Sequence, residues 1–319
     1  MMDSLETIPY VNSVFEQPWW LETVAPGRWR EAVVRENGEV IARLPYVVYK
    51  GRMGERVGMP KLTQTLGAWI DPRIRQCVNG NKQLYREKEI INQLMAQLPE
   101  KRPVSICLDS ANRYVLPYRW LGFRIEPTFS YRISDLRDLD GVYARFDKST
   151  RQTIRSAGRK LFISRESDVQ LLWKLLDITF KHQKRRIPLD QTMVKRIVEE
   201  SCKRDQGLML SAMDERGNCH SMSFFIYDER ICYNLLSGSD PAYRSSGAQS
   251  LVIWEGIQFA AKNSNVFDFE GSMVEGIENF FRRFGGEMVT NYRITRQGLG
   301  RDCMDMLKPR VKHMLGYKI

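Results

Sequence analysis

The sequence predicts two similar α/β domains in tandem, each a mixed, mostly antiparallel sheet flanked by helices. Both halves show the same order of strand-like and helix-like segments, and their closing segments look alike. These segments end at Ile133 and Ile294, 161 residues apart, and the same offset separates Asp109 from Glu270, each just past a strand-like run. A shared order with a constant offset is typical of an internal duplication. We therefore expect domains at residues 1–140 and 141–319.

The first half begins with a predicted hairpin. Residues 30–35 and 39–49 have strand character and flank the turn 36–38, Glu-Asn-Gly, which is a common hairpin turn sequence. The remaining periodicity predicts a third strand over 56–59, a helix over 84–98, a strand over 103–108 and a closing strand over 124–133.

The second half is predicted to contain an antiparallel meander. Ser167 and Gln170 form a capping box that opens a helix, and a second amphipathic helix follows Asp190. Three strand-like runs at 207–214, 219–227 and 230–236 are joined by short turns, which predicts the meander. A helix, a strand over 266–270, a helix over 275–283 and a strand over 287–295 complete the order.

Composition indicates a soluble, globular chain. The 319 residues are 43% hydrophobic and 27% charged, enough for two cores of ordinary size. No apolar run reaches the ~18–20 residues that a membrane-spanning helix needs. The N-terminal segment has early acidic residues and no apolar signal core, so we predict a cytoplasmic protein.

The scattered cysteines and histidines argue against a metal site. The six cysteines have no metal-ligand spacing, and the three histidines are far apart in the sequence. By contrast, the formal charge of +11 favours an anionic partner such as RNA, a phosphate-rich donor or an anionic lipid surface. No resident metal is expected, and the oligomeric state stays open.

A loop of small residues precedes the helix of residues 248–260. It contains Arg244, Ser245, Ser246, Gly247 and Ala248. The first N–H groups of a helix lack internal partners, and a neighbouring glycine and arginine make such a loop a ready anion site. Ser and Gly are also ordinary helix caps, so both interpretations stay open at this point.

The loop and the order of elements resemble the GNAT acetyltransferase fold. In that family, a Q/R-x-x-G-x-G/A loop holds the phosphates of coenzyme A. Residues 244–249, Arg-Ser-Ser-Gly-Ala-Gln, match its first and fourth positions, whereas Gln249 departs at the last. The resemblance implies acyl-CoA or acetyl-CoA as donor, bound by the second domain. The corresponding stretch of the first half, near 79–82, lacks the pattern.

Two such domains in one chain resemble the Fem-type transferases, which add amino acids to peptidoglycan precursors. The resemblance rests on the basic segment 146–157, the segment 267–272 (Phe-Asp-Phe-Glu-Gly-Ser) and the segment 277–286 with its Phe-Gly-Gly ending. It implies an aminoacyl-tRNA donor and a cell-envelope precursor as one alternative. Phe281 stands where those enzymes place a lysine that handles the aminoacyl ester, and this departure disfavours a tRNA donor.

Asp268 and Glu270 are the candidate catalytic residues. They are two apart on a predicted strand and therefore share a face. A carboxylate in a cleft can take the proton of an attacking amine. Glu270 ranks first, because it lies beside a glycine at a strand end, where open α/β folds place ligands. The alternative is that one or both pair with arginines such as Arg282 or Arg293.

Five further residues are candidates for substrate binding. Arg151 and Arg155 belong to a basic helix that either holds an anionic acceptor or RNA, or is a solvated face. Arg186 lies in a basic run before a loop, Gln64 is placed near the interdomain cleft, and Ser272 follows Gly271 at the strand end where ligands are expected.

Three functions stay open. The first is an N-acyltransferase that moves an acyl group from acyl-CoA to an amine acceptor, which is a small molecule or a cell-envelope precursor. The second is an aminoacyl-tRNA-dependent aminoacyltransferase, and the third is an inactive module that binds polyanions.

Overall fold

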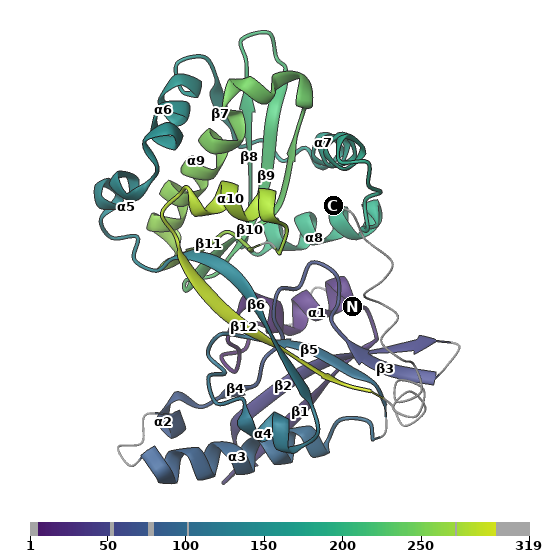
Figure 1. The fold of residues 1–319 in the computed structure, drawn as a ribbon. Helices are drawn as coiled ribbons and strands as arrows, with labels where there is room; N and C mark the ends of the chain where they lie inside the picture. The colour runs from purple at the N-terminus through teal and green to yellow at the C-terminus, as the bar shows by residue number, and fades with distance from the viewer. Residues whose placement is uncertain (1–5, 52–53, 76–79, 101, 272, 298–319) are drawn as a thin grey trace, which may run out of the picture.

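The computed structural model describes residues 6–51, 54–75, 80–100, 102–271 and 273–297 (Figure 1). The first half contains η1 (Val14–Glu16), α1 (Pro18–Val24), β1 (Trp29–Glu36), β2 (Glu39–Gly51), β3 (Gly54–Gly58), β4 (Trp69–Ile70), α2 (Pro72–Arg75), α3 (Gly80–Ala96), β5 (Val104–Leu108), α4 (Leu116–Trp120) and β6 (Arg124–Ile133). None of the described helices is long and apolar enough to cross a membrane.

The second half contains α5 (Leu139–Arg145), α6 (Lys148–Ala157), β7 (Phe162–Ser164), α7 (Val169–His182), α8 (Gln191–Lys203), β8 (Gly207–Met213), β9 (Cys219–Tyr227), β10 (Ile231–Ser239), η2 (Pro241–Ser246), α9 (Ala248–Asn263), β11 (Val266–Asp268), α10 (Glu275–Arg282) and β12 (Glu287–Arg296). The predicted meander is confirmed, because β8, β9 and β10 pair antiparallel. One cap differs from the prediction: Asp168, and not Ser167, caps α7 by accepting from Leu171 N at 2.9 Å.

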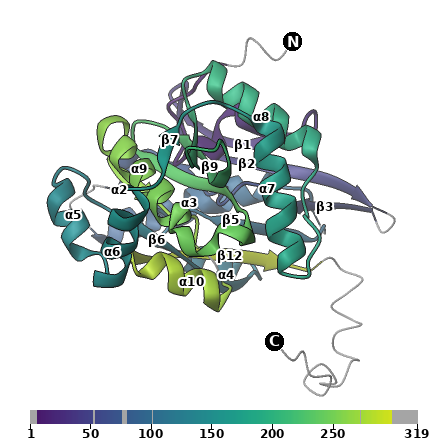
Figure 2. The same cartoon turned by 90° about the horizontal axis from the view of Figure 1, so that it is seen from above.

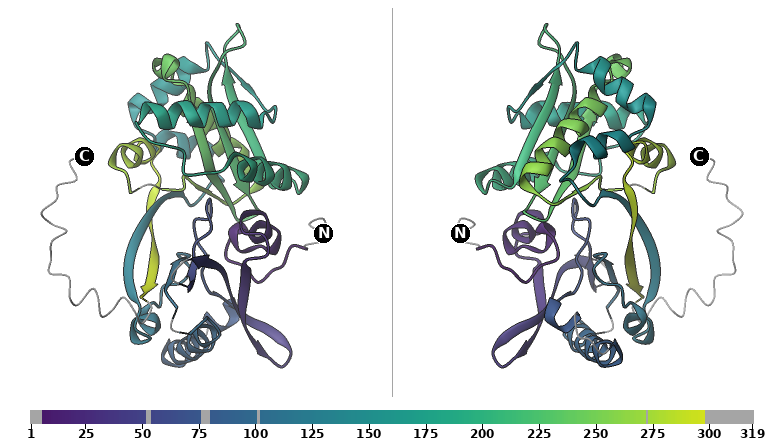
Figure 3. Two further views of the ribbon diagram at one scale, coloured as in Figure 1. Left: turned by 90° about the vertical axis from the view of Figure 1, so that its right-hand side faces the viewer. Right: turned by 90° about the vertical axis from the view of Figure 1, so that its left-hand side faces the viewer.

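The two predicted sheets form one continuous sheet, in which the last strand of each half also pairs with a strand of the other half. The strand order is β1-β2-β3-β5-β12-β6-β11-β10-β9-β8-β7, with β4 paired to β2. β12, the last strand of the second half, pairs with β5 of the first, and β6 pairs with β11 of the second. β6 and β12 also pair with each other and run together between the halves (Figure 3).

The duplication is visible in the register of this central pair. Phe129 of β6 lies opposite Thr290 of β12, and these residues are 161 positions apart, the offset found in the sequence. The strand pairing on either side of this point also corresponds: β3 pairs parallel with β5 in the first half, and β10 pairs parallel with β11 in the second. The mixed, mostly antiparallel sheet of each half is therefore confirmed.

Helices cover both faces of the second-half sheet (Figure 2). Alternate residues of β9 explain this: Phe224 and Ile226 pack with α7 and α8, whereas Phe225 and Tyr227 pack with α9 and α6. Such alternation follows from the period of two in a strand. α1 joins the α7–α8 layer, where Trp19 and Trp20 are buried, so an N-terminal helix completes the core of the second half.

Candidate active site

The predicted loop forms the start of α9. After β10 ends at Ser239, the chain turns through η2, and Gly247 takes a left-handed φ of 76° before α9 begins. Gly247 is the N-cap residue, and Ser246 Oγ, one residue earlier, accepts from Ala248 N at 3.2 Å. A Cβ added at Gly247 would lie 2.6 Å from Thr153 Cγ2 on α6. The glycine is therefore required both by its backbone conformation and by the close approach of α6.

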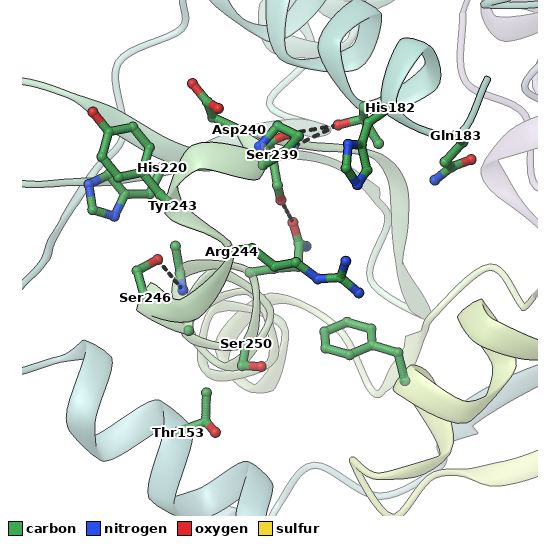
Figure 4. Close-up of a pocket in the computed structure, with 16 residues that line it drawn as sticks. Thr153, His182, Gln183, His220, Ser239, Asp240, Tyr243, Arg244, Ser246 and Ser250 are labelled. Carbon is green, nitrogen blue, oxygen red and sulfur yellow. Dashed lines mark hydrogen bonds between the residues drawn. The ribbon is translucent and has the colours of Figure 1, made fainter. Parts of the chain in front are cut away.

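A cavity of about 540 Å³ opens beside this loop (Figure 4). Of the predicted loop residues, Arg244, Ser246, Gly247 and Ala248 line it, whereas Ser245 is exposed and does not. Arg244 extends into the cavity in Figure 4. The cavity therefore combines a helix N-terminus with an arginine side chain, the combination that favours an anionic ligand.

Sequence reasoning missed several residues that line this cavity. His220 stacks on Tyr243 with ring centroids 3.9 Å apart and planes 6° apart, and its Nε2 lies 3.2 Å from Asp214 Oδ2. Thr179, His182 and Gln183 come from the end of α7. Except for Tyr243, which directly precedes Arg244, these residues lie far from the loop in the sequence, so no local motif signals them.

Gln249, the residue that departs from the family pattern, turns its side chain toward the sheet. Its Oε1 accepts from Ser221 Oγ at 2.5 Å and from Ser239 Oγ at 3.0 Å, and its Nε2 donates to Ser223 Oγ at 3.2 Å. The amide is thus held by three hydroxyl groups of β9 and β10. A larger residue at this motif position is accommodated without pointing into the loop.

A second cavity of about 360 Å³ holds Glu270. It lies where β10 continues to Ser239 while the paired β11 stops at Asp268. Asn234 and Ser237 give it a polar wall, and Phe280 and Phe281 give it an apolar one. It shares lining residues with the loop cavity, namely Thr179, Gln183, Ser239, Gln249 and Phe280.

Glu270 has an unpaired carboxylate oxygen in this second cavity. Its Oε1 is buried and has no hydrogen-bond partner in the described structure. Burial, together with the nearby charge of Asp268, holds the Glu270 pKa well above its ordinary value. Its backbone φ is 53°, so the chain leaves the extended strand conformation here, and the face shared with Asp268 expected from a regular strand is not formed.

Asp268 is instead part of a buried ion pair. Its Oδ2 accepts from Arg132 Nε at 2.6 Å, and its Oδ1 accepts from Ser130 Oγ at 2.5 Å and from Gln64 Nε2 at 3.3 Å. Its arginine partner is therefore Arg132, and not the Arg282 or Arg293 considered from the sequence. Glu270 N also donates to Asp268 Oδ1 at 2.7 Å, which fixes the backbone of Glu270.

The predicted substrate-binding residues are dispersed. Gln64 lies beside Asp268, but Arg151 caps the end of α5 by donating to Ala144 O at 2.5 Å and to Phe146 O at 2.6 Å. Arg155 and Arg186 are exposed and line neither of the two cavities described above. Ser272 lies outside the described residues. Their roles toward an acceptor stay predictions.

No cluster of metal-ligating side chains occurs among the residues that the structure describes.

Phe281 occupies the position at which the Fem-type enzymes place a lysine. Phe281 lines the Glu270 cavity and packs on Phe269 with ring centroids 5.4 Å apart. The adjacent Arg282 pairs with Glu278 at 3.6 Å and lines neither cavity.

Comparison with known proteins identifies the fold. Residues 144–282 match the family model described as an acetyltransferase (GNAT) domain. No curated protein matches the sequence. Among solved structures, the chain is similar to FemX with a TM-score of 0.70 at 13% identity, covering 96% of each chain.

Two further structures are similar over most of their length. A conserved protein of unknown function from Bacteroides thetaiotaomicron VPI-5482 gives a TM-score of 0.55 at 12% identity, covering 86% of each chain. L-PGS from Bacillus licheniformis gives 0.51 at 13% identity, covering 93% of this chain and 92% of that one. At such identities the likeness concerns the fold. The chain is a GNAT-fold protein with the tandem architecture seen in FemX.

Proposed function

We propose that the protein is an N-acyltransferase that moves an acyl group from an acyl-CoA donor to an amine. One observation carries this proposal: the loop cavity and the Glu270 cavity adjoin, with Thr179, Ser239 and Gln249 among their shared lining residues. A donor with its pyrophosphate on the loop would extend its thioester toward Glu270. Positioning two reactants in this way accounts for much of the catalysis in such a reaction.

The loop supports the pyrophosphate end of the donor. The N–H groups of the first turn of α9 have no helical acceptors, and Gly247 allows close approach of a ligand to the backbone. Arg244 adds a forked cationic donor. The stacked His220–Tyr243 pair forms one wall of the same cavity.

Glu270 supports the chemical step. The amine nitrogen attacks the thioester carbonyl carbon, the C–S bond breaks, and coenzyme A leaves as the thiolate, which takes a proton from solvent water to become the thiol while Glu270 returns its proton to solvent. The amine loses one proton, and the Glu270 carboxylate is the group in the cavity that accepts it. Because its pKa is raised, this carboxylate is a stronger base than an exposed glutamate.

The binding half of the proposal is tested by calorimetry with coenzyme A. Arg244→Ala is expected to weaken binding by about 1–3 kcal/mol through loss of a charged hydrogen bond. Ser245→Ala is the matched control, because Ser245 is exposed and does not line the cavity. Equal affinity of both variants and the parent protein would remove the loop from the donor site. Retention of aminoacyl-tRNA without coenzyme A binding would favour the Fem-type alternative.

The chemical half is tested by thiol release from acetyl-CoA with a panel of amines. The active form of Glu270 is the carboxylate, so the rate should rise with pH through the raised pKa and be lost as the pH falls below it. Glu270→Gln is expected to retain coenzyme A affinity and to lose this pH-dependent rate. An unchanged pH profile in the variant would assign the proton transfer elsewhere.

A further inference from the structure

An exposed apolar patch lies on the two outer helices of the first half. It consists of Leu84, Tyr85, Leu116 and Trp120, of which Tyr85 is 71% and Trp120 58% exposed. Figure 1 places α3 and α4 together at the end of the first half away from α9. This α3–α4 patch has no role in the cavities of the proposed active site.

The patch is contiguous. Leu116 and Trp120 are four residues apart on α4 and therefore share a helix face. Tyr114 packs edge-on against Trp120 with ring centroids 6.3 Å apart. Tyr114 and Leu84 line one further cavity of about 590 Å³, which joins the α3 and α4 parts of the patch.

Two basic side chains, Lys88 and Arg119, lie beside these apolar groups. Lys88 Nζ lies 5.1 Å from the centroid of the Trp120 ring, and Arg119, next to Trp120 in the chain, is exposed. The acidic residues of α3 are Glu87 and Glu89, which are ion-paired with Arg75 at 3.4 Å and Arg86 at 3.3 Å. α4 contains none. The patch is therefore apolar at its centre and positively charged at its rim.

We propose that the α3–α4 patch docks the protein onto an anionic phospholipid surface. Tryptophan and tyrosine favour the boundary between lipid and water, and lysine extends its ammonium group to the headgroups while its stem stays apolar. Leucines insert below them, and each basic residue near an anionic membrane adds attraction. A second copy of the chain fits less well, because a symmetric contact would bring Lys88 and Arg119 of both copies together.

The test is co-sedimentation of the full chain with vesicles of phosphatidylglycerol and phosphatidylcholine, compared with phosphatidylcholine alone. We expect binding to the anionic vesicles only, weakened by salt. Tyr85→Ser/Trp120→Ser should reduce it about tenfold or more, because two aromatic rings no longer leave water. Lys88→Gln/Arg119→Gln should reduce it about 25-fold, about fivefold for each cation.

The matched control is Phe162→Ser/Met288→Ser, which removes side chains of similar exposure, 53% and 60%, from strands outside the patch. It should bind vesicles like the parent protein. The variants change exposed side chains and the half-buried Lys88, and thermal unfolding verifies that they fold. Absence of binding to anionic vesicles at low salt overturns the proposal. Equal loss in the control also overturns it, as does self-association that the Tyr85→Ser/Trp120→Ser variant abolishes without any vesicle binding.

Discussion

Asp268 forms a buried ion pair that links the two halves. Arg132 comes from β6 and Asp268 from β11, and both side chains are largely buried. Asp109, the repeat counterpart of Glu270, lies 4.0 Å from the Arg132 guanidinium. Burial raises the pKa of Asp109, and Arg132 opposes that rise. A single arginine therefore compensates carboxylates from both halves.

Removing one partner of this ion pair should be costly. Asp268→Asn leaves the Arg132 charge buried without its 2.6 Å partner, and loss of one partner of a buried pair typically costs about 3–5 kcal/mol. Urea unfolding measures the change. Asp135→Asn is the control, because Asp135 pairs with Arg137 at the exposed surface, where such pairs contribute about 0–1 kcal/mol. Similar losses in the two variants would contradict a structural role for Asp268.

Glu270 should make stability depend on pH. Its folded pKa lies well above the ordinary 4.5, so the folded state holds a proton that the unfolded state releases. The free energy of unfolding should therefore fall as the pH rises from about 4.5 to the raised pKa, by up to about 1.4 kcal/mol per pH unit. Glu270→Gln should remove this contribution and be more stable than the parent protein at pH 8. If the free energy of unfolding changes with pH in the same way in both proteins, the raised pKa of Glu270 is contradicted.

At the scale of elements, the α6–α9 contact depends on Gly247. A Cβ there would meet Thr153 Cγ2, and φ of 76° adds strain for any other residue. Gly247→Ala should therefore destabilise the fold, and Thr153→Ser, which removes that methyl group, should recover part of the loss. A double-mutant cycle by thermal unfolding measures the coupling. If the effects of the two substitutions on stability simply add, α6 shifts away from the new Cβ without cost. Arg244→Ala is thus a cleaner probe of donor binding than a change at Gly247.

Most elements could be predicted from the sequence, because periodicity and capping are local signals. β9 has the predicted bounds, and Met193, Val194, Ile197 and Val198 of α8 are buried as their spacing implies. The loop residues were identified because their motif is contiguous. The Arg132 partner of Asp268 and the His220–Tyr243 stack were not, since their members lie on different elements. Long-range pairing leaves no mark in a short window of sequence.

At the scale of the molecule, the exchange of β6 and β12 makes each half depend on the other. Ile294 of β12 is fully buried in the first-half core, together with residues such as Ile106 and Leu108 of β5. In return, β6 covers the open edge of β11, and α1 packs on α8. A division after residue 140 falls in the first turn of α5 (Leu139–Arg145), where the chain passes to the second half but the sheet does not end.

The fragments 1–140 and 141–319 are therefore expected not to fold as separate stable domains. Fragment 1–140 lacks β12, so β5 loses its partner over five paired positions from Val104 to Leu108, and such an unpaired edge promotes aggregation. Fragment 141–319 lacks both β6 and α1. In the full chain, Ile294→Ala should cost about 2–5 kcal/mol and lower the unfolding temperature of both halves together, because the shared strands couple them. Calorimetry reports the number of transitions: one transition that shifts as a unit is expected. Two transitions, of which Ile294→Ala moves only the first-half one, would show that the exchanged strands join two independent domains.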